Sequence, residues 1–398
     1  METNLYLPTD YSAEKTETLS TVSAVQPYVY ACVFSSLCIV TGLIWDISWH
    51  MSIGRDGLFA PPHLVIYIGA VVSGLFSGFQ VLKTSFFSNP AEKAKAVKFW
   101  GIFYGSLGAL FCIWGAIAML TSAPFDDWWH NTYGLDVTIL SPPHTLLAIG
   151  MMMIQFGTLI AVIASTNHLR ENQSKTIHNW LFAIASGLLL TTFFTLFSEF
   201  LGKHRMHKAL FYQIGCLLFP LYLITVARAS KMKWAATATA AVYTLQLLLM
   251  LWVLPLFPAS PRLGPVLNHI DHYQAFDFPL LVIFPAMMID WLFLQLHTKK
   301  GWVKTVSAAL AFLAVFFVVQ WFFGTFLHTS VLARSWFFGG TSWYFGSDPN
   351  YQYRYSFRPE NVDTGFTLIK GLMVAAVIAL ISGTIGYKWG SWMRKVQR

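Results

Sequence analysis

Residues 46–63 read Asp-Ile-Ser-Trp-His-Met-Ser-Ile-Gly-Arg-Asp-Gly-Leu-Phe-Ala-Pro-Pro-His, and a stretch of the same design follows at residues 126–144. The second stretch reads Asp-Asp-Trp-Trp-His-Asn-Thr-Tyr-Gly-Leu-Asp-Val-Thr-Ile-Leu-Ser-Pro-Pro-His. When the first aspartates are aligned, both contain Asp, Trp, His, Gly, a second Asp and a Pro-Pro-His triplet, with one extra residue before the second triplet. Because random drift among apolar residues does not reproduce charged and imidazole groups at fixed offsets, we take this repeat as the key to fold and function.

Each copy of the repeat joins two apolar segments. Asp46 and His50 are four residues apart near the end of one segment, so both project from one face of a helix. The two prolines before His63 open the next helix, where proline is tolerated in the first turn. If the two helices pack as a hairpin, His63 can approach Asp46 and His50. The same geometry is expected for Asp126, His130 and His144.

The composition predicts a membrane protein. The 398 residues are 56% hydrophobic and only 11% charged, whereas soluble proteins contain about 25% charged residues. Apolar stretches recur along the chain, and each is close in length to the roughly 20 residues needed to cross a bilayer. They cover residues 27–49, 62–83, 98–121, 142–165, 178–200, 207–229, 233–257, 275–297, 303–325 and 365–390. Since backbone polar groups in lipid must be satisfied internally, we expect an all-α transmembrane bundle of about ten spans.

The expected spans divide the chain into five parts. They are a polar N-terminal segment (1–26), a duplicated two-span repeat (27–165, with halves 27–83 and 98–165), additional spans (166–325), an aromatic loop (326–364) and a last span with a basic tail (365–398). Ten spans place both termini on the side richer in Lys and Arg, which the positive-inside rule assigns to the cytoplasm. We therefore expect a bacterial inner-membrane protein with both repeats at its extracytoplasmic face.

Composition also excludes some functions. The net charge of +8 does not indicate nucleic-acid binding, because no basic patch alternates with exposed aromatic residues. The polar segment 1–26 lacks a basic n-region, so we expect no cleaved signal peptide. All four cysteines fall inside apolar stretches without a CxxC pair, which is typical of core residues. The expected partners are the bilayer itself and, in a complex, further subunits or a second copy of the chain.

The chemistry of the repeat points to metal ions. One carboxylate with two imidazoles suits copper, zinc or non-haem iron. Asp56 and Asp136 are candidates to hold the outer N–H of the imidazoles and fix their tautomers, and Trp49 and Trp129 are expected to wall the sites. The alternative is that the Asp–His pairs are interfacial ion pairs and the Pro-Pro-His triplets merely start helices.

The first stretch resembles a metal site of the C subunit of the copper membrane monooxygenases, the family of particulate methane and ammonia monooxygenases. That site has the form Asp-x3-His-x12-His in a Trp-His…Arg-Asp…Phe-x-Pro-x-His context. The matching residues here are Trp49, His50, Arg55, Asp56, Phe59, Pro61 and His63. The family's second site, Asn-x3-His-x13-His, has the spacing of Asp126, His130 and His144, with Asp in place of Asn. The resemblance covers about residues 40–150, and residues 151–398 show no motif of the other subunits.

The resemblance implies a membrane oxidoreductase with one or two copper ions, which hydroxylates an apolar or lipidic substrate with dioxygen. The electron donor would be a partner or a quinol. A zinc-dependent membrane hydrolase and a non-catalytic copper-handling protein, transporter or complex subunit stay open as alternatives.

Further polar groups lie in the second half of the chain. His204 and His207 are interpreted mainly as contacts to lipid headgroups or a substrate carboxylate, because cations surround them. His269 and His272 flank Asp271 and could chelate if helical, or form a solvated turn. Asp290 lies deep in an expected span. It is either a functional residue or a residue that forms an interhelical hydrogen bond. The loop 326–364, which begins near His328, is expected to form a lid or an aromatic interfacial segment.

Overall fold

The computed structural model describes residues 25–54, 56–134, 141–169 and 174–397. The predictions for Asp136 and for most of the N-terminal segment therefore lie outside the described residues. The described part is helical, with one small β-hairpin. This confirms the expected all-α class.

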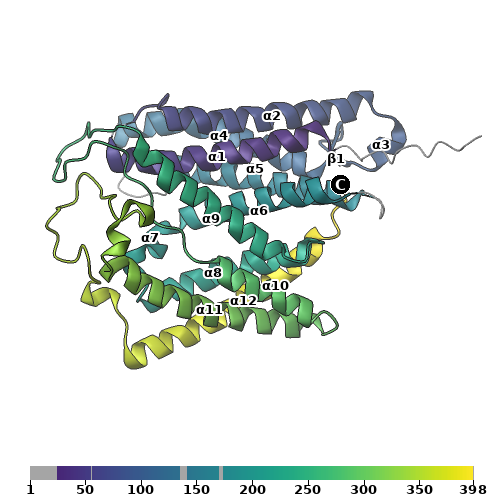
Figure 1. The fold of residues 1–398 in the computed structure, drawn as a ribbon. Helices are drawn as coiled ribbons and strands as arrows, with labels where there is room; N and C mark the ends of the chain where they lie inside the picture. The colour runs from purple at the N-terminus through teal and green to yellow at the C-terminus, as the bar shows by residue number, and fades with distance from the viewer. Residues whose placement is uncertain (1–24, 55, 135–140, 170–173, 398) are drawn as a thin grey trace, which may run out of the picture.

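Within the described residues, nine helices are long and apolar enough to cross a membrane, as expected of a polytopic membrane protein. They are α1 (Pro27–Ser52), α2 (Pro61–Phe87), α4 (Leu107–Tyr133), α5 (Pro142–Asn167), α6 (Thr176–Leu196), α8 (Ala209–Ala229), α9 (Ala235–Val253, extended to Leu256 by a 3-10 turn), α11 (Gly301–Thr329) and α12 (Gly365–Met393). The shorter helices are α3 (Pro90–Ala94), α7 (Ser198–Leu201) and α10 (Ile283–Gln295). In Figure 1 the repeat helices α1, α2, α4 and α5 form one side of the bundle and α8, α11 and α12 the other, with α6 and α9 between them.

The two halves of the repeat form helical hairpins that pack against each other. Helix α1 packs on α2, α4 packs on α5, and further contacts join α2 to α4 and α1 to α5. One apolar cluster fills the space between all four helices and includes Leu43, Tyr67, Met119 and Leu147. These residues lie within one or two helical turns of the repeated Asp and His positions, so a common core supports both copies of the repeat.

The third expected span starts later than predicted. Instead of a helix from residue 98, strands β1 (Val97–Phe99) and β2 (Phe103–Gly105) form an antiparallel hairpin. Helix α4 starts only after Ser106, whose side chain accepts a hydrogen bond from Ala109 N at 3.2 Å and so caps the helix. The helix then runs to Tyr133, which places the second repeat's Asp and first His inside its last turns.

The expected helix over residues 275–297 is limited to α10, because residues 275–282 are not helical. Pro279 lacks an N–H and disfavours helix in the residue before it. Non-helical backbone at this depth must find other partners. The N–H of Leu280 donates to the Tyr243 hydroxyl (3.1 Å) and that of Leu281 to Oε1 of Gln320 (2.8 Å). Hydropathy alone could not reveal this break, because both acceptors come from other helices.

The second half is held together by close helix contacts. Helix α12 packs along α8, and a Cβ built on Gly386 would lie 2.2 Å from the carbonyl oxygen of Leu221. The glycine therefore allows the two backbones to approach closely, a common device between membrane helices. Helix α11 extends to Thr329, so the predicted aromatic loop begins at Ser330 rather than at 326.

Candidate metal sites

The first copy of the repeat brings three predicted side chains together. Asp46 and His50 lie in the last turns of α1, and His63 lies in the first turn of α2. Nε2 of His63 is 3.2 Å from Oδ1 of Asp46, and Nε2 of His50 is 3.8 Å from Oδ2 of the same carboxylate. The predicted hairpin geometry is therefore present in the structure.

Asp56, from the loop between α1 and α2, reaches into the same cluster. Its Oδ2 lies 3.4 Å from Nε2 of His50 and 3.1 Å from Nε2 of His63. From the sequence we expected Asp56 to hold the outer nitrogen of an imidazole, but in the structure it lies against the same Nε2 atoms that face Asp46. Two carboxylates and two imidazoles thus converge. Asp46, His50 and Asp56 form a group in which one ligand atom from each residue lies within 4.8 Å of the others, and His63 is not part of that group.

The two imidazoles also affect the charge of Asp56. Burial by itself raises the pKa of this carboxyl, but the contacts with His50 and His63 lower it more strongly. The net pKa lies well below its usual value, so Asp56 is an anion at neutral pH. His50 is the most exposed of the four side chains of the cluster. The side chains of Asp56 and His63 are 15% and 16% exposed, whereas His50 is 46% exposed.

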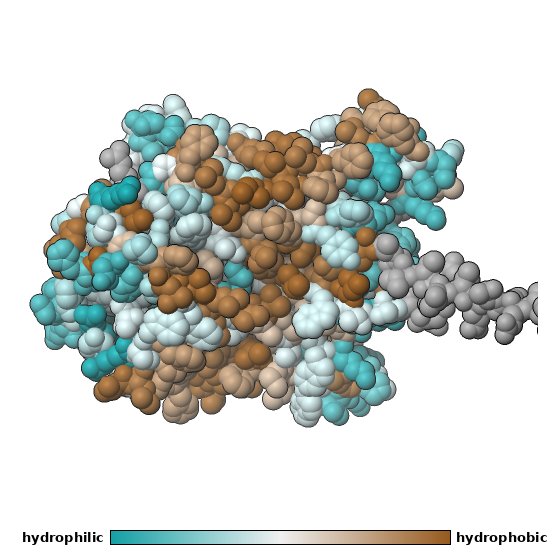
Figure 2. Space-filling view, turned by 45° about the horizontal axis from the view of Figure 1, so that its top comes forward, coloured by the Kyte–Doolittle hydropathy of each residue, from teal (hydrophilic) through white to brown (hydrophobic). Residues whose placement is uncertain are grey.

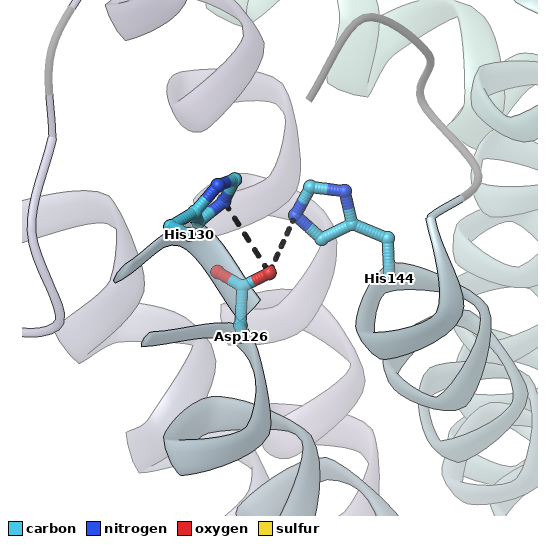
Figure 3. A group of neighbouring side chains, drawn as sticks. All are labelled: Asp126, His130 and His144. Carbon is cyan, nitrogen blue, oxygen red and sulfur yellow. Dashed lines mark ion pairs between the residues drawn. The ribbon is translucent and has the colours of Figure 1, made fainter. Parts of the chain in front are cut away.

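The second copy forms a similar group. Asp126 and His130 lie in the last turns of α4 and His144 in the first turn of α5. Figure 3 shows both rings turned towards one oxygen, Oδ1 of Asp126, from which Nε2 of His130 is 3.5 Å and Nε2 of His144 3.4 Å distant. Ser141 caps α5 by accepting a hydrogen bond from His144 N (3.4 Å), which fixes the start of the helix that carries this ligand.

The hydrogen bonds of His130 define its tautomer. Its Nδ1 lies 3.1 Å from the carbonyl oxygen of Gly134. A carbonyl can only accept, so Nδ1 carries the proton and, in the neutral ring, Nε2 presents a lone pair to Asp126. A lone pair facing a carboxylate is unfavourable unless a cation or a second proton lies between them. Metal-bound histidines commonly use such a carbonyl contact to orient the ring.

The repeated glycine serves the same local purpose in both copies. Gly54 and Gly134 follow the ends of α1 and α4 and have φ angles of 84° and 87°, a backbone conformation that side chains disfavour. In the first copy the glycine also makes room, since a Cβ on Gly54 would lie 2.7 Å from Cζ of Phe345. Among the described residues, nothing lies within 4 Å of the equivalent position on Gly134.

Loops from the second half of the chain cover the end of α1 beside the first cluster. The hydroxyl of Ser48 donates to the carbonyl of Gln274 (2.6 Å), and Gln274 N donates to the hydroxyl of Ser52 (2.7 Å). From the aromatic loop, Trp343 N donates to Oε1 of Gln274 (2.6 Å) and Phe345 packs against Gly54. These covering residues could not be identified from the sequence, because the contacts of Gln274 and Phe345 with the end of α1 join residues more than 200 positions apart.

Each predicted tryptophan directly precedes a histidine of its cluster and packs on a tyrosine. Trp49 precedes His50 and its ring lies 6.2 Å from that of Tyr273. Trp129 precedes His130 and packs on Tyr133 with a centroid distance of 4.6 Å. An additional aromatic residue, Tyr67, lies one turn after His63 with the two rings 6.1 Å apart.

The histidines at residues 204, 207 and 328 do not join either cluster. His207 is sandwiched between Trp321 and Phe357, at centroid distances of 4.1 and 4.0 Å, and its Nε2 lies 3.0 Å from the carbonyl of Trp321. His328 is buried and packs on the same Phe357. Burial lowers the pKa of His204. The carboxylate of Asp277 acts in the opposite direction, but the nearby cations Arg205 and Lys203 offset it, so the pKa lies below its usual value. Among the described residues these histidines form no group of three metal ligands.

The second predicted group, around Asp271, lacks the geometry that chelation requires. Residues 264–282 contain no described helix, so His269 and His272 do not share a helical face. His272 Nδ1 instead contacts Oδ1 of Asp271 at 2.6 Å, and the Asp271 side chain is 95% exposed. The hydrogen bond from His272 lowers the pKa of Asp271. This arrangement matches the solvated-turn interpretation.

Asp290 is engaged as a helix cap. Its carboxylate accepts hydrogen bonds from Ala236 N (3.2 Å), Thr237 N (2.7 Å) and the Thr237 hydroxyl (2.7 Å), at the start of α9. A carboxylate at a helix N-terminus satisfies free N–H groups and interacts with the helix dipole. These interhelical hydrogen bonds are enough to explain why the carboxylate of Asp290 is buried.

The carboxylate–imidazole distances in both repeat clusters are compatible with a shared metal ion. Four ligands at 2.0–2.1 Å from a tetrahedral ion are about 3.3 Å from one another. The observed separations of 3.1–3.8 Å in the first cluster and 3.4–3.5 Å in the second are close to this value. Oδ1 of Asp46 is buried without a hydrogen-bond partner among the described residues, although His63 is near. Nδ1 of His63 is also buried without a hydrogen-bond partner among the described residues. This differs from most metal-bound histidines, whose second ring nitrogen donates a hydrogen bond.

Comparisons with known proteins add no assignment. No family model, no curated protein and no solved structure matches the chain. The resemblance to the copper membrane monooxygenases therefore rests on the residues of the repeat alone.

Proposed function

We propose that this protein is an integral membrane metalloprotein that holds two transition-metal ions, one in each copy of the repeat, and acts as a copper-dependent, monooxygenase-like oxidoreductase. The observation that carries the proposal is the convergence of histidine Nε2 atoms on a carboxylate, formed twice by the same sequence pattern. Asp46, His50, His63 and Asp56 would hold one ion. Asp126, His130 and His144 would hold the other.

The donor atoms favour a borderline metal. Imidazole nitrogen with carboxylate oxygen suits copper, zinc and iron, and disfavours magnesium or calcium, which prefer oxygen ligands alone. The resemblance of the spacing supports copper among these. A copper ion bound there would supply redox chemistry towards dioxygen. In the second cluster the carbonyl of Gly134 would orient His130, and in the first an incoming ligand would approach beside the exposed His50.

An apolar groove supports an apolar substrate. It measures about 270 Å³ and is lined only by apolar side chains of α4, α5, α6 and α12. On α5 it begins at Ile149, five residues after His144, which corresponds to about 7.5 Å of helix rise. A hydrocarbon dissolved in the bilayer could therefore lie close to the second cluster.

The proposal includes a location and a source of electrons. The distribution of basic residues supports a bacterial inner membrane with the clusters at the extracytoplasmic face. Reductant would come from a partner subunit or a quinol.

Metal analysis of the purified protein tests the proposal. We expect two ions per chain, and about one after either His50→Ala with His63→Ala or His130→Ala with His144→Ala. Asp127→Asn is the matched control. Asp127 neighbours Asp126 but is exposed and pairs with Asn131 (3.3 Å), so its replacement should leave the stoichiometry at two.

The identity of the metal decides between reaction classes. Copper with a Cu(II) electron paramagnetic resonance signal, lost in the double-histidine variants, supports the oxidoreductase. Zinc alone would replace it with the hydrolase alternative. A correctly folded protein that binds no metal after reconstitution would refute both.

A further inference from the structure

The hairpin between α2 and α4 has an unusual turn. Val97 pairs with Gly105 and Phe99 with Phe103, and Ile102 N donates to Phe99 O at 3.3 Å. The two central residues of this turn, Trp100 and Gly101, both have positive φ angles, 49° and 72°. Positive φ is uncommon for a bulky residue, so the surrounding structure holds the indole in place.

The hairpin is fixed to the membrane helix before it. The hydroxyl of Ser85, in the last turn but one of α2, accepts a hydrogen bond from Tyr104 N (2.8 Å) and donates one to Val81 O (2.7 Å). A Cβ on Gly105 would lie 2.7 Å from Val81, so β2 packs directly on the helix. The hairpin is therefore a docked element of the bundle.

The tip of the hairpin bends along the outside of the bundle. The ring of Trp100 lies edge-on against Trp114, with centroids 5.6 Å apart. Trp114 is seven residues into α4, about 10 Å of helix rise from its start. The indole therefore lies beside a membrane-spanning helix instead of extending past its end.

Large apolar side chains around this tip are exposed. Phe87 is 84% exposed, Trp100 69%, Ile102 61% and Phe86 60%. Such a cluster at the end of two spanning helices is typical of the membrane interface, where aromatic rings are enriched. Figure 2 shows apolar and polar residues side by side at the end of the molecule where α3 and β1 lie.

The same segment carries a concentrated positive charge. Residues 83–106 contain four lysines (Lys83, Lys93, Lys95 and Lys98) and one acidic residue, Glu92. Nζ of Lys93 and Nζ of Lys98 each lie 5.7 Å from the centre of the Tyr104 ring. The ring thus gathers two cations next to the exposed aromatic tip.

We propose that residues 83–106, the hairpin anchor, bind the headgroups of anionic phospholipids. The aromatic tip enters the interface and the lysines contact lipid phosphates. Basic residues near an anionic leaflet are attracted to it, and exposed aromatic side chains add apolar burial. The partner is a lipid surface because both features lie at the ends of two spans, where headgroups are the neighbouring phase. This inference is independent of the metal sites.

Position at the interface is tested with a dye. Ile102→Cys is labelled with an environment-sensitive fluorophore in full-length protein in nanodiscs, and Glu92→Cys is the control on the same segment. Three of the native cysteines are buried and Cys38 is half-buried, so wild type carried through the same labelling reaction gives the background. We expect brominated lipids to quench the dye at position 102, and aqueous iodide to quench it at position 92. Equal iodide quenching at both positions would overturn the proposal.

Charge selectivity is tested with a triple variant, Lys93→Gln, Lys95→Gln and Lys98→Gln. Wild type in mixed phosphatidylcholine and phosphatidylglycerol should enrich phosphatidylglycerol in its lipid shell, measured by mass spectrometry after purification, and high salt should reduce this enrichment. The triple variant should lose most of it at unchanged melting temperature.

A second triple variant is the matched control, Lys299→Gln, Lys300→Gln and Lys388→Gln, which removes three exposed lysines outside the hairpin anchor. It should keep the enrichment. If the hairpin variant kept it too, or if both variants lost it equally, no specific anionic-lipid site would exist at the hairpin.

Discussion

Nε2 of His63 lies 3.1 Å from Oδ2 of Asp56 and 3.2 Å from Oδ1 of Asp46. One imidazole thus contacts two carboxylates, from the loop and from α1. This arrangement places Asp56 among the candidate ligands of the first cluster and makes the two clusters chemically unequal.

The first prediction concerns metal affinity. Asp56→Asn should weaken binding at the first cluster by at least about tenfold, because even carboxylates that only orient a ligand contribute 10- to 100-fold. The second cluster should keep its affinity. Competition titration with a chelator on a variant lacking His130 and His144 isolates the first cluster. An unchanged affinity there would show that Asp56 is not a ligand.

The second prediction concerns acid stability of the metal-free protein. The folded-state pKa of Asp56 lies below its ordinary value of 3.8, so its ionised form stabilises the fold. That stabilisation is complete above the ordinary pKa and is lost as pH falls towards the folded pKa, at about 1.4 kcal/mol per pKa unit. Between about pH 5 and pH 2.5, the melting temperature of wild type should fall more steeply than that of Asp56→Asn. Parallel curves would contradict the depressed pKa.

The third prediction compares the two repeated glycines. Gly134→Ala should cost about 1–3 kcal/mol, the penalty for a side chain at φ 87° and ψ −172°, a region that essentially only glycine adopts. Gly54→Ala should cost more, because its Cβ would also meet Phe345 at 2.7 Å and Leu263 at 2.9 Å. Gly57 has open space and no positive φ, so Gly57→Ala is the control. In thermal unfolding, the loss of stability should decrease in the order Gly54→Ala, Gly134→Ala, Gly57→Ala. Equal losses for the first two variants would show that the covering loop does not contribute to the cost at Gly54.

The fourth prediction concerns the broken helix before α10. Gln320→Leu removes the acceptor of Leu281 N–H and leaves a buried donor unsatisfied, at a cost of about 1–3 kcal/mol. Tyr243→Phe should have a similar effect through Leu280. Gln295 is exposed at the end of α10, so Gln295→Leu should change the melting temperature little. If Gln320→Leu left the melting temperature unchanged, these side chains would not support the non-helical segment 275–282.

Local features of the chain were predictable. The apolar stretches predicted the helices, because membrane crossing requires a length and composition that a single segment displays. The offsets of Asp46, His50 and His63 predicted a shared face and a helical hairpin, because the helix period is fixed.

Other features depended on contacts between distant segments. Only the tertiary structure placed Asp56 against both imidazoles, since the path of a loop is set by what it packs on. The β-hairpin at 97–105 forms against Ser85 of α2, and the non-helical segment 275–282 is supported by Tyr243 and Gln320, which accept the N–H groups of Leu280 and Leu281. The sequence by itself determined the repeat, its Asp and His side chains and the helical bundle. The tertiary structure decided how those side chains converge and which loops cover them, because these contacts join residues far apart in the chain.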